Sequence, residues 1–293
     1  MNFRFTNSSK ERINRVIILG SSGIISTNLQ RLLKSKNINT LAIGSSKLNL
    51  KKNTYKDLRK KIKKNDIVIF IAAEAPVKNT EMFFNNLQMC RTVCKSLENK
   101  KIKQLIYISS DAVYGDDKKK ITEKSNILPG SLHGLMHSTR EKILKDKFNK
   151  ILCILRPTLI YGSGDTHNGY GPNRFIDLAL KSKKISIFGN GEEKRDHIFI
   201  EDLVNIIVKC LEKKALGILN LASGKVYSFK KIAQEVINLT NSDSKIKKIK
   251  RNGPMPHNGY RPFNTNLLKK YFKEIKLSSL NVGIKKYLNS ISI

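Results

Sequence analysis

The first half of the chain alternates between short apolar runs and segments with helical spacing of apolar residues. The apolar runs cover Arg15–Leu19, Thr40–Ile43, Ile67–Ala72, Leu105–Ser109 and Ile151–Leu155. The helical segments cover Ile24–Lys34, Glu81–Glu98 and Gly134–Phe148. Continuous apolar runs are typical of parallel strands that are buried on both faces. Strands that alternate with helices therefore predict an α/β fold built on a doubly wound parallel sheet.

The residue composition and the pattern of apolar positions change after Tyr161. Residues 162–172 are rich in Gly, Asn and Asp, which predicts a loop. The elements expected beyond it are a helix at Arg174–Lys181, a strand at Ile185–Phe188, a turn at Gly189–Gly191, a helix from Glu201, a strand at Ile218–Leu221, and a helix near Phe229 capped by Ser228. We predict a main domain at residues 1–164 and a smaller lobe at 165–293. A segment at about 198–224 is expected to return to the main sheet.

Length and hydrophobic content favour a globular protein. The chain has 293 residues, of which 40% are hydrophobic, so a sizeable core can form. No apolar run reaches the roughly 18 residues of a membrane span, and the first residues lack the apolar stretch of a signal peptide. We therefore expect a cytoplasmic protein without a membrane partner. The four cysteines show no zinc-site spacing and are expected to be reduced packing residues.

The formal net charge of +33 raises the question of a polyanionic partner. The lysines are scattered through every segment, however, and Asn and Ile are also abundant. This pattern is typical of a general compositional bias, and lysine-rich stretches such as Lys245–Arg251 are most often solvated faces. No nucleic-acid recognition motif accompanies the charge, so we expect no nucleic-acid partner. The positive field would still attract a small anionic substrate.

A glycine-rich turn joins the first strand to the first helix. Gly20 follows Val16–Leu19 and permits a tight turn, and Gly23 lets the backbone approach a pyrophosphate at the helix N-terminus. The motif stands at a strand, opens a helix and lies in a βαβ pattern, which is the context that a dinucleotide site requires. This indicates a Rossmann domain that binds a nicotinamide dinucleotide. The residues expected to contact it are Gly20, Ser21, Ser22, Gly23 and Ile24.

The end of the second strand bears on the choice of dinucleotide. An NAD site usually has Asp or Glu there to bind the ribose hydroxyls, and this chain has neither. Ser45 and Lys47 are instead suited to a 2′-phosphate. We therefore expect NADP as the cofactor, with NAD still possible.

With these motifs, residues 14–290 resemble the extended short-chain dehydrogenase/reductase family, of the NAD-dependent epimerase/dehydratase type that modifies nucleotide sugars. Its glycine motif usually has a third glycine where this chain has Ser26. Ser109–Gly115 closely matches the family's Ser-Ser-x-x-Val-Tyr-Gly, and Ser110 falls where a catalytic Ser or Thr hydrogen-bonds the reacting sugar oxygen. The resemblance also implies that Ala72, Ala73 and Pro157 lie beside the cofactor.

The family's next signature is Tyr-x-x-x-Lys, in which the Tyr is the acid/base and the Lys lowers its pKa and binds the nicotinamide ribose. Here these positions are His133 and His137, although the flanking Pro, Gly and Glu keep their spacing. Residues four apart on a helix share a face. Because imidazole titrates near 6.5, His133 can act as the acid without a lysine, and His137 is expected to bind the ribose.

Three other interpretations of the His133–His137 pair remain open. The chain could bind a dinucleotide without catalysing a reaction, as a sensor or scaffold. The pair could also bind a metal, since a spacing of four suits ligands, but the Glu of a His-Glu-x-x-His motif is missing, and we expect no metal. The histidines could finally be simple packing residues. Tyr114 is an alternative acid, although the family uses that residue in structure.

The second half of the chain also carries residues that match the family. Arg195, after the Gly189–Gly191 turn, and Arg261 correspond to arginines that bind the substrate diphosphate, and planar guanidinium groups suit that role. Asn173 follows the Gly-Pro that leads into the substrate-lobe helix and is expected to contact substrate. The family's substrate-binding Asn is Leu159 here.

Together these features predict an NAD(P)-dependent oxidoreductase or epimerase that transfers hydride at a carbon of a nucleotide-activated sugar. The second strand resembles that of reductase members of the family, which have a short ribose loop bearing Ser and Lys, and this resemblance favours a keto-sugar reductase over an epimerase. A dehydratase fits less well, because those relatives have Asp-Glu after the catalytic Ser or Thr, and this chain has Asp111-Ala112. Its assembly as a homodimer is possible.

Overall fold

A computed structural model of the chain describes residues 1–116, 119–165 and 169–291. Its residues divide into two compact units. The first unit comprises residues 1–115, 125–157 and 204–220, and the second comprises 116–124, 158–203 and 221–293. Residues 166–168 of the predicted loop lie outside the described residues.

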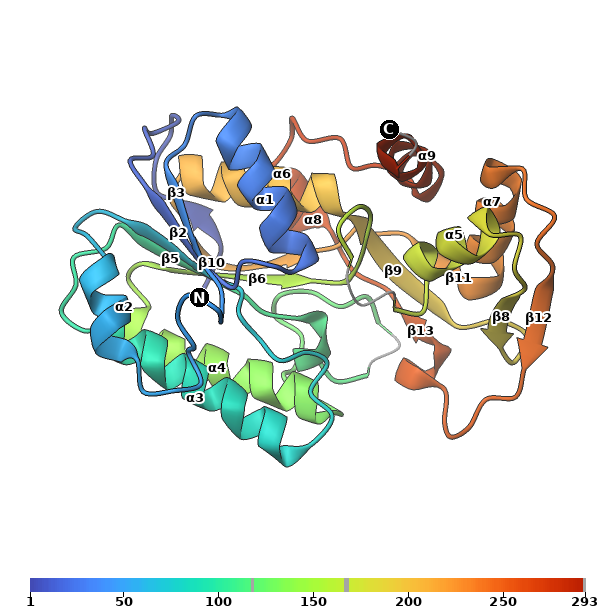
Figure 1. The fold of residues 1–293 in the computed structure, drawn as a ribbon, viewed down its shortest axis with the longest axis horizontal. Helices are drawn as coiled ribbons and strands as arrows, with labels where there is room; N and C mark the ends of the chain where they lie inside the picture. The colour runs from blue at the N-terminus through green and yellow to red at the C-terminus, as the bar shows by residue number, and fades with distance from the viewer. Residues whose placement is uncertain (117–118, 166–168, 292–293) are drawn as a thin grey trace. The chain divides into compact units, whose positions relative to one another are not determined.

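A large, mainly parallel sheet forms the centre of the first unit (Figure 1). Within the described residues its strands are, in spatial order, β1 (Arg4–Phe5), β10 (Ala215–Leu221), β6 (Leu152–Pro157), β5 (Gln104–Ile108), β4 (Ile67–Phe70), β2 (Val16–Leu19) and β3 (Thr40–Ile43). The neighbours from β6 to β3 run parallel, and β1 pairs antiparallel with β10. The predicted α/β class with a doubly wound Rossmann sheet is confirmed.

Helices cover both faces of this sheet, as Figure 1 shows. α1 (Ile24–Ser35) and α6 (Ile200–Glu212) lie on one face, and α2 (Tyr55–Lys61), α3 (Thr80–Leu97) and α4 (Leu132–Phe148) lie on the other. The central strands β2, β4, β5 and β6 are buried along their whole length because each face packs against helices, whereas the edge strand β3 is mostly half-buried. β10 lies within the segment expected to return to the sheet, whereas the boundary at residue 164 stays a prediction.

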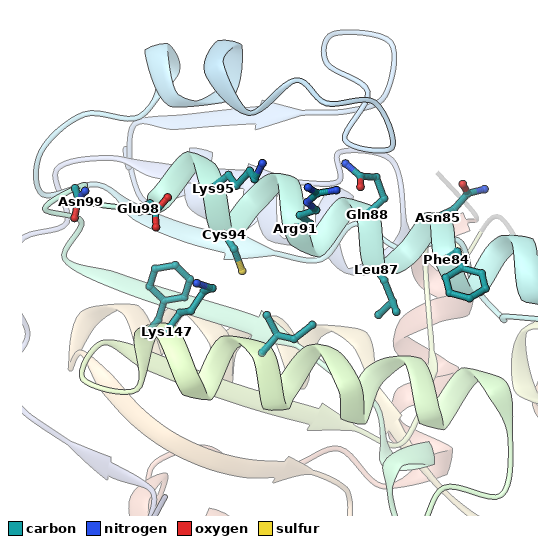
Figure 2. A pocket seen from close by; sticks show the side chains of 12 residues that line it. Phe84, Asn85, Leu87, Gln88, Arg91, Cys94, Lys95, Glu98, Asn99 and Lys147 are labelled. Atoms are coloured by element: carbon teal, nitrogen blue, oxygen red, sulfur yellow. The ribbon is translucent and has the colours of Figure 1, made fainter.

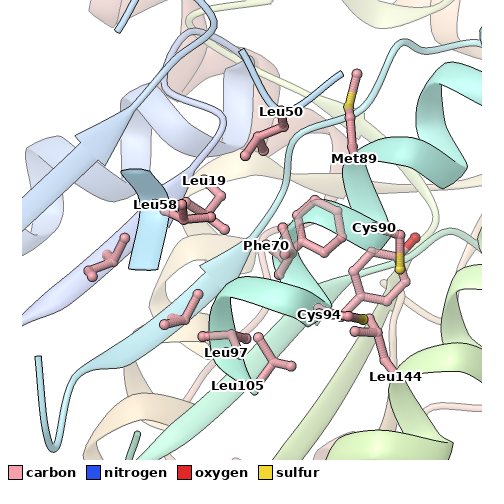
Figure 3. Packing of buried hydrophobic residues seen from close by; sticks show 14 of the residues in the cluster. Leu19, Leu50, Leu58, Phe70, Met89, Cys90, Cys94, Leu97, Leu105 and Leu144 are labelled. Atoms are coloured by element: carbon pink, nitrogen blue, oxygen red, sulfur yellow. The ribbon is translucent and has the colours of Figure 1, made fainter. Parts of the chain in front are cut away.

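The core beneath α2, α3 and α4 is built from aliphatic, aromatic and cysteine side chains (Figure 3). Leu58 of α2, Leu97 of α3 and Leu144 of α4 all face sheet residues such as Phe70, and none exceeds 1% exposure. Cys90 is also buried in this cluster, and all four cysteines are free and buried. Burying side chains of this size stabilises the fold by roughly 1.5–3 kcal/mol each.

The second unit combines short strands with helices. Its elements are β7 (Leu159–Tyr161), α5 (Pro172–Leu180), β8 (Ile185–Phe188), β9 (Lys194–Phe199), β11 (Val226–Ser228), α7 (Phe229–Thr240), β12 (Ile246–Ile249), η2 (Pro256–Gly259), β13 (Tyr260–Arg261), α8 (Asn266–Tyr271) and α9 (Leu280–Ile291). β9 pairs with β7, β11 and β13, and β8 pairs with β12. Ser228 caps α7 as predicted, because its hydroxyl accepts a hydrogen bond from the Lys231 N–H.

Candidate active site

The carboxyl ends of the parallel strands carry the residues predicted to bind the dinucleotide. The sheet order reverses between β2 and β4, and ligands of doubly wound folds bind at such a switch point. Gly20 follows β2 with a φ of +101°, and a Cβ there would lie 2.8 Å from the Ala72 nitrogen after β4. Only glycine combines this conformation with so close an approach.

The N-terminus of α1 is open to an anion. Gly23 precedes the helix in an extended conformation, no side chain caps the first turn, and no acidic residue lies in it. A Cβ at Gly23 would meet no atom within 4 Å. The Gln30 side chain donates to the Ser21 carbonyl at 2.9 Å and so holds the turn. Free N–H groups beside open space fit the pyrophosphate of a dinucleotide.

A cavity of about 230 Å³ lies next to this turn. The predicted cofactor residues that line it are Gly20, Ser21, Ser22, Ser45, Ala72 and Ala73. Its lining also includes Lys51 and Glu74, whose charged atoms are 2.7 Å apart. The sequence reasoning missed this pair, because its members lie 23 positions apart in different loops. Lys47 is exposed and is not part of the lining.

Ser110 lies just beyond β5, at the start of the short helix η1 (Asp111–Val113). Its hydroxyl accepts a hydrogen bond from the Ala112 N–H at 3.1 Å, and the side chain remains partly exposed. α4 packs directly on η1, since a Cβ at Gly134 would collide with the Ala112 carbonyl oxygen. This close packing brings the start of α4 to the segment that carries Ser110.

His133 and His137 lie on the same face of α4, as their spacing predicts. Their rings meet edge to face with centroids 4.7 Å apart. Burial lowers the pKa of His133, the carboxylate of Asp111 opposes the shift, and the charge of Arg140 adds to it. The Nδ1 atom of His133 lies 3.5 Å from the Val77 N–H, at the limit of a hydrogen bond. Nδ1 is the ring nitrogen in this contact, and Nε2 is not part of it.

His137 is buried, with 5% of its surface exposed. Its Nδ1 lies 2.7 Å from the hydroxyl of Tyr107, a fully buried residue of β5. Burial lowers the pKa of His137 well below 6.5, and the nearby His133 and Arg140 lower it further. Burial raises the pKa of Tyr107. Both side chains are therefore neutral at pH 7.

Arg140 is a fully buried charge one turn beyond His137. Its guanidinium donates to the carbonyl oxygens of Asn86 and Ala72 at 2.9 Å, and to the Asn86 side-chain oxygen at 2.9 Å. It also stacks over the Phe70 ring at 4.8 Å. A buried guanidinium is tolerated when its N–H groups are satisfied in this way. Arg140 thereby ties α4 to the end of β4, and sequence reasoning did not single it out.

Tyr114 belongs to a buried structural network. Its hydroxyl donates to the Asn220 side chain at 2.7 Å and accepts from Arg156 at 2.7 Å. Arg156 also pairs with both carboxylate oxygens of Glu141. Burial acts to raise the pKa of Glu141, but the hydrogen bonds and charge of Arg156 outweigh it and lower the pKa. With its hydroxyl engaged on both sides, Tyr114 is better placed for packing than for proton transfer.

In the second unit, Arg195 and Arg261 lie on adjacent strands. Arg261 of β13 is the register partner of Arg195 in β9. Arg195 reaches Glu193 at 3.3 Å, and Arg261 reaches the Asp116 carboxylate at 2.9 Å. The charges of both arginines contribute, after burial, to a lowered pKa of His257. The structure thus brings the two predicted diphosphate ligands together on one sheet.

Two other polar residues of this unit organise its loops. The Asn173 side chain accepts from the Gly162 N–H at 2.9 Å and donates to its carbonyl oxygen at 3.0 Å. Asp196 accepts from the Ser223 and Gly224 N–H groups, both at 2.8 Å. Burial raises the pKa of Asp196 to about 6, although these hydrogen bonds oppose the shift. The contact of Asn173 with substrate stays a prediction.

The outer side of α3 and α4 forms a groove of about 900 Å³ (Figure 2). Leu87 and Cys94 point from α3 toward α4, and Phe84 lies at one end with 65% of its surface exposed. Arg91 and Lys95 project from the other side of α3. This groove is separate from the cavity beside the glycine turn.

The described ranges, 1–116, 119–165 and 169–291, include no helix with the length and hydrophobicity of a membrane span. They also contain no group of three or more His, Cys, Asp or Glu side chains that could hold a metal ion.

Comparisons with known proteins address the family directly. Residues 16–222 match the model of the NAD dependent epimerase/dehydratase family, which is more than half of the chain. An uncharacterised UDP-glucose epimerase of Bacillus subtilis (strain 168) is 26% identical over 234 residues, covering 69% of this chain and 74% of that protein.

Solved structures share the fold over almost the whole chain. The UDP-glucose 4-epimerase of Thermus thermophilus in complex with NAD superposes with a TM-score of 0.81 at 16% identity, over 95% of this chain and 99% of that one. The GDP-L-fucose synthetase of Naegleria fowleri bound to NADP gives a TM-score of 0.84 at 13% identity, over 98% and 96%. On the extent of the family match, this chain belongs to the NAD dependent epimerase/dehydratase family.

Proposed function

We propose that the chain is an NAD(P)-dependent oxidoreductase or epimerase that transfers hydride at a carbon of a nucleotide-activated sugar. One observation carries the proposal. The glycine turn, the Ser110 segment and the start of α4 with His133 are all held at the carboxyl edge of one sheet, by the close contacts of Gly20 and Gly134. The family relatives that act on nucleotide sugars or bind NAD and NADP support the same reaction class.

Within this reaction the bound dinucleotide supplies or accepts the hydride. In the reducing direction, the keto carbon would gain the hydride that the dinucleotide supplies, and the carbonyl oxygen would gain a proton. Ser110 donates a hydrogen bond to that oxygen, and the His133 imidazolium delivers the proton from Nε2. Nδ1 carries the other ring proton in this step, so the long contact of Nδ1 with the Val77 N–H is given up. Because the pKa of His133 lies below 6.5, reduction should accelerate as the pH falls from 8 toward 6.5.

We assign the keto-sugar reductase reaction first place within this class, on the sequence of the ribose-binding loop. For the cofactor we propose NADP. No acidic residue follows β3, and Ser45 and Lys51 line the cavity where the adenosine ribose would bind. This choice can be tested by measuring the Kd values of NADPH and NADH. The proteins to compare are the wild type, Lys51→Gln and Lys47→Gln. A loss of NADPH preference in either variant supports it, and tighter NADH binding by the wild type contradicts it.

We propose that Arg195 and Arg261 bind the substrate diphosphate. They are register partners on β9 and β13, and a pair of guanidinium groups can bond several phosphate oxygens at once. Replacing either with Lys keeps the charge but removes the planar pair of donors. The expected result is a raised KM for the nucleotide sugar, with cofactor affinity unchanged.

The competing function is dinucleotide binding without catalysis. The observation in its favour is that burial disfavours the charged form of both histidines at the positions of the family's Tyr and Lys. A panel of nucleotide sugars and their keto forms, mixed with NADPH or NADP, separates the two functions. Turnover of any member that is lost in His133→Ala supports the enzyme, whereas tight NADPH binding without turnover of any member favours the binding protein.

We also propose a homodimer that forms through the groove between α3 and α4. Its floor is apolar, its rim carries Glu98 together with Lys95 and Lys147, and Phe84 stands exposed beside it. Charges of both signs on one patch allow it to pair with its own copy. Light scattering should give a dimer for the wild type and a monomer for Phe84→Glu. A monomeric wild type would contradict the proposal.

A further inference from the structure

Tyr107 is buried, yet its hydroxyl is directed at a residue of the candidate active site. It lies on β5 with no exposed surface, and its oxygen is 2.7 Å from Nδ1 of His137. The two rings are 5.9 Å apart between centroids. Phenylalanine would fill the same space, so the hydroxyl adds the contact with His137 and a side-chain hydrogen bond in which Arg140 is the donor.

The proton in this contact can be assigned from the donors and acceptors present. A neutral imidazole has one donor nitrogen and one acceptor nitrogen. If Nδ1 carried the proton, the Tyr107 O–H would need a different acceptor. Among the hydrogen bonds of the described residues, His137 Nδ1 is the acceptor within reach of that hydroxyl. A buried hydroxyl without an acceptor is strongly disfavoured, so the O–H donates to Nδ1.

We propose that Tyr107 is a positioning residue, which fixes His137 as the Nε2–H tautomer so that this N–H can donate to a ribose hydroxyl of the bound dinucleotide. The ribose contact rests on the proposed function, but the tautomer does not. The family's lysine would donate from a charged ammonium group at this position. His137 would instead donate from a neutral N–H whose direction is fixed by the contact with Tyr107. Arg140, one turn further along α4, retains a positive charge beneath the site and is anchored on Ala72 and Asn86.

The neutral state of both partners agrees with this arrangement. Burial lowers the pKa of His137 and raises that of Tyr107, so neither ionises near pH 7. A second proton on His137 would remove the acceptor that Tyr107 uses. The contact and the burial therefore favour the same single protonation state.

The tautomer can be read from the nitrogen chemical shifts of ¹⁵N-histidine-labelled protein, with His137→Gln used for assignment. We expect an unprotonated Nδ1 and a protonated Nε2 for His137 in the wild type. In Tyr107→Phe, which removes only the hydroxyl, the two shifts should move toward each other as both tautomers become populated. Tyr161→Phe, at another buried tyrosine, is the matched control and should leave them unchanged.

Cofactor affinity provides the second measurement. Tyr107→Phe should weaken NADPH binding by about 3- to 10-fold, the usual effect of one neutral hydrogen bond, while Tyr161→Phe should not. A protonated Nδ1 in the wild type, or identical His137 shifts in Tyr107→Phe, would overturn the tautomer assignment. Shifts that move without any loss of affinity would overturn the ribose contact. A wild type that binds neither NADPH nor NADH would contradict the proposed function and the ribose contact, while the shifts would still decide the tautomer.

Discussion

At the scale of single residues, Gly134 determines how closely α4 approaches the loop that carries Ser110. Its missing Cβ leaves room for the Ala112 carbonyl oxygen. The collision partner is backbone, which cannot rotate away as a flexible side chain can. His133 immediately precedes Gly134 in the chain, so the distance from His133 to Ser110 depends on this contact.

Gly134→Ala should therefore destabilise the protein by about 1–3 kcal/mol, as overpacking usually does. Gly130→Ala is the matched control, because a Cβ there would meet no atom within 4 Å. Thermal unfolding of both variants measures the difference. Equal melting temperatures for the two would contradict the close packing of α4 on η1.

Gly23 gives the opposite prediction, since its proposed role concerns the ligand and not the fold. Its φ of −80° suits any residue, and a Cβ would point into open space. Gly23→Ala should keep the wild-type melting temperature but weaken NADPH binding about 10-fold or more, or about 1.4 kcal/mol, because the methyl group would lie where the pyrophosphate approaches. Calorimetric titration would reveal this loss, and unchanged affinity would argue against a pyrophosphate at the N-terminus of α1.

At the scale of elements, α4 couples the stability of the first unit to pH. His133 and His137 both have pKa values below 6.5 in the folded protein, and Arg140 lies beside them. Between those lowered values and 6.5, the unfolded chain binds more protons than the folded one. Stability contributed by the neutral histidines is therefore present above pH 6.5 and is lost as the pH falls below it.

Urea unfolding at pH 7.5 and pH 5.5 tests this coupling. For the wild type, the free energy of unfolding should be lower at pH 5.5 than at pH 7.5. The difference should be smaller for His137→Gln, because glutamine cannot be protonated. Asp196 works in the opposite direction, because its pKa is raised to about 6, and stability is lost as the pH rises through the interval from 3.8 to 6. The test therefore compares how strongly the free energy of unfolding changes with pH in the variant and in the wild type. An identical change in both proteins would refute the coupling.

The elements that sequence patterns predicted well are those with a strong local signal. β3 and β8 have the predicted bounds, and the long helices α3 and α4 differ from prediction by one or two residues. α2 was missed because a single buried apolar residue, Leu58, supports it. β1, β7, β11 and β13 are two or three residues long, and they exist through pairing with distant segments. The local pattern of apolar residues does not indicate pairing with a distant segment.

At the scale of the whole molecule, the sequence predicted that Gly20 and Ala72 lie at one edge of the sheet but not how the histidines are held. Gly20 and Ala72 follow strands, so their meeting at the sheet edge follows from the βαβ order. The contacts of Tyr107 with His137 and of Arg140 with Ala72 join positions 30 and 68 residues apart. They depend on the rotation of α4 against the sheet, which side-chain packing decides.

The central claim is that this chain transfers hydride with histidine in place of the family's tyrosine. The most direct test follows deuterium from NADPH deuterated at the transferring carbon into a keto nucleotide sugar, detected by mass spectrometry in a single turnover. We predict transfer in the wild type and a rate at least about 10²-fold lower in His133→Ala, with NADPH affinity retained. Transfer at the same rate in His133→Ala, or no transfer to any sugar despite tight NADPH binding, would contradict the claim.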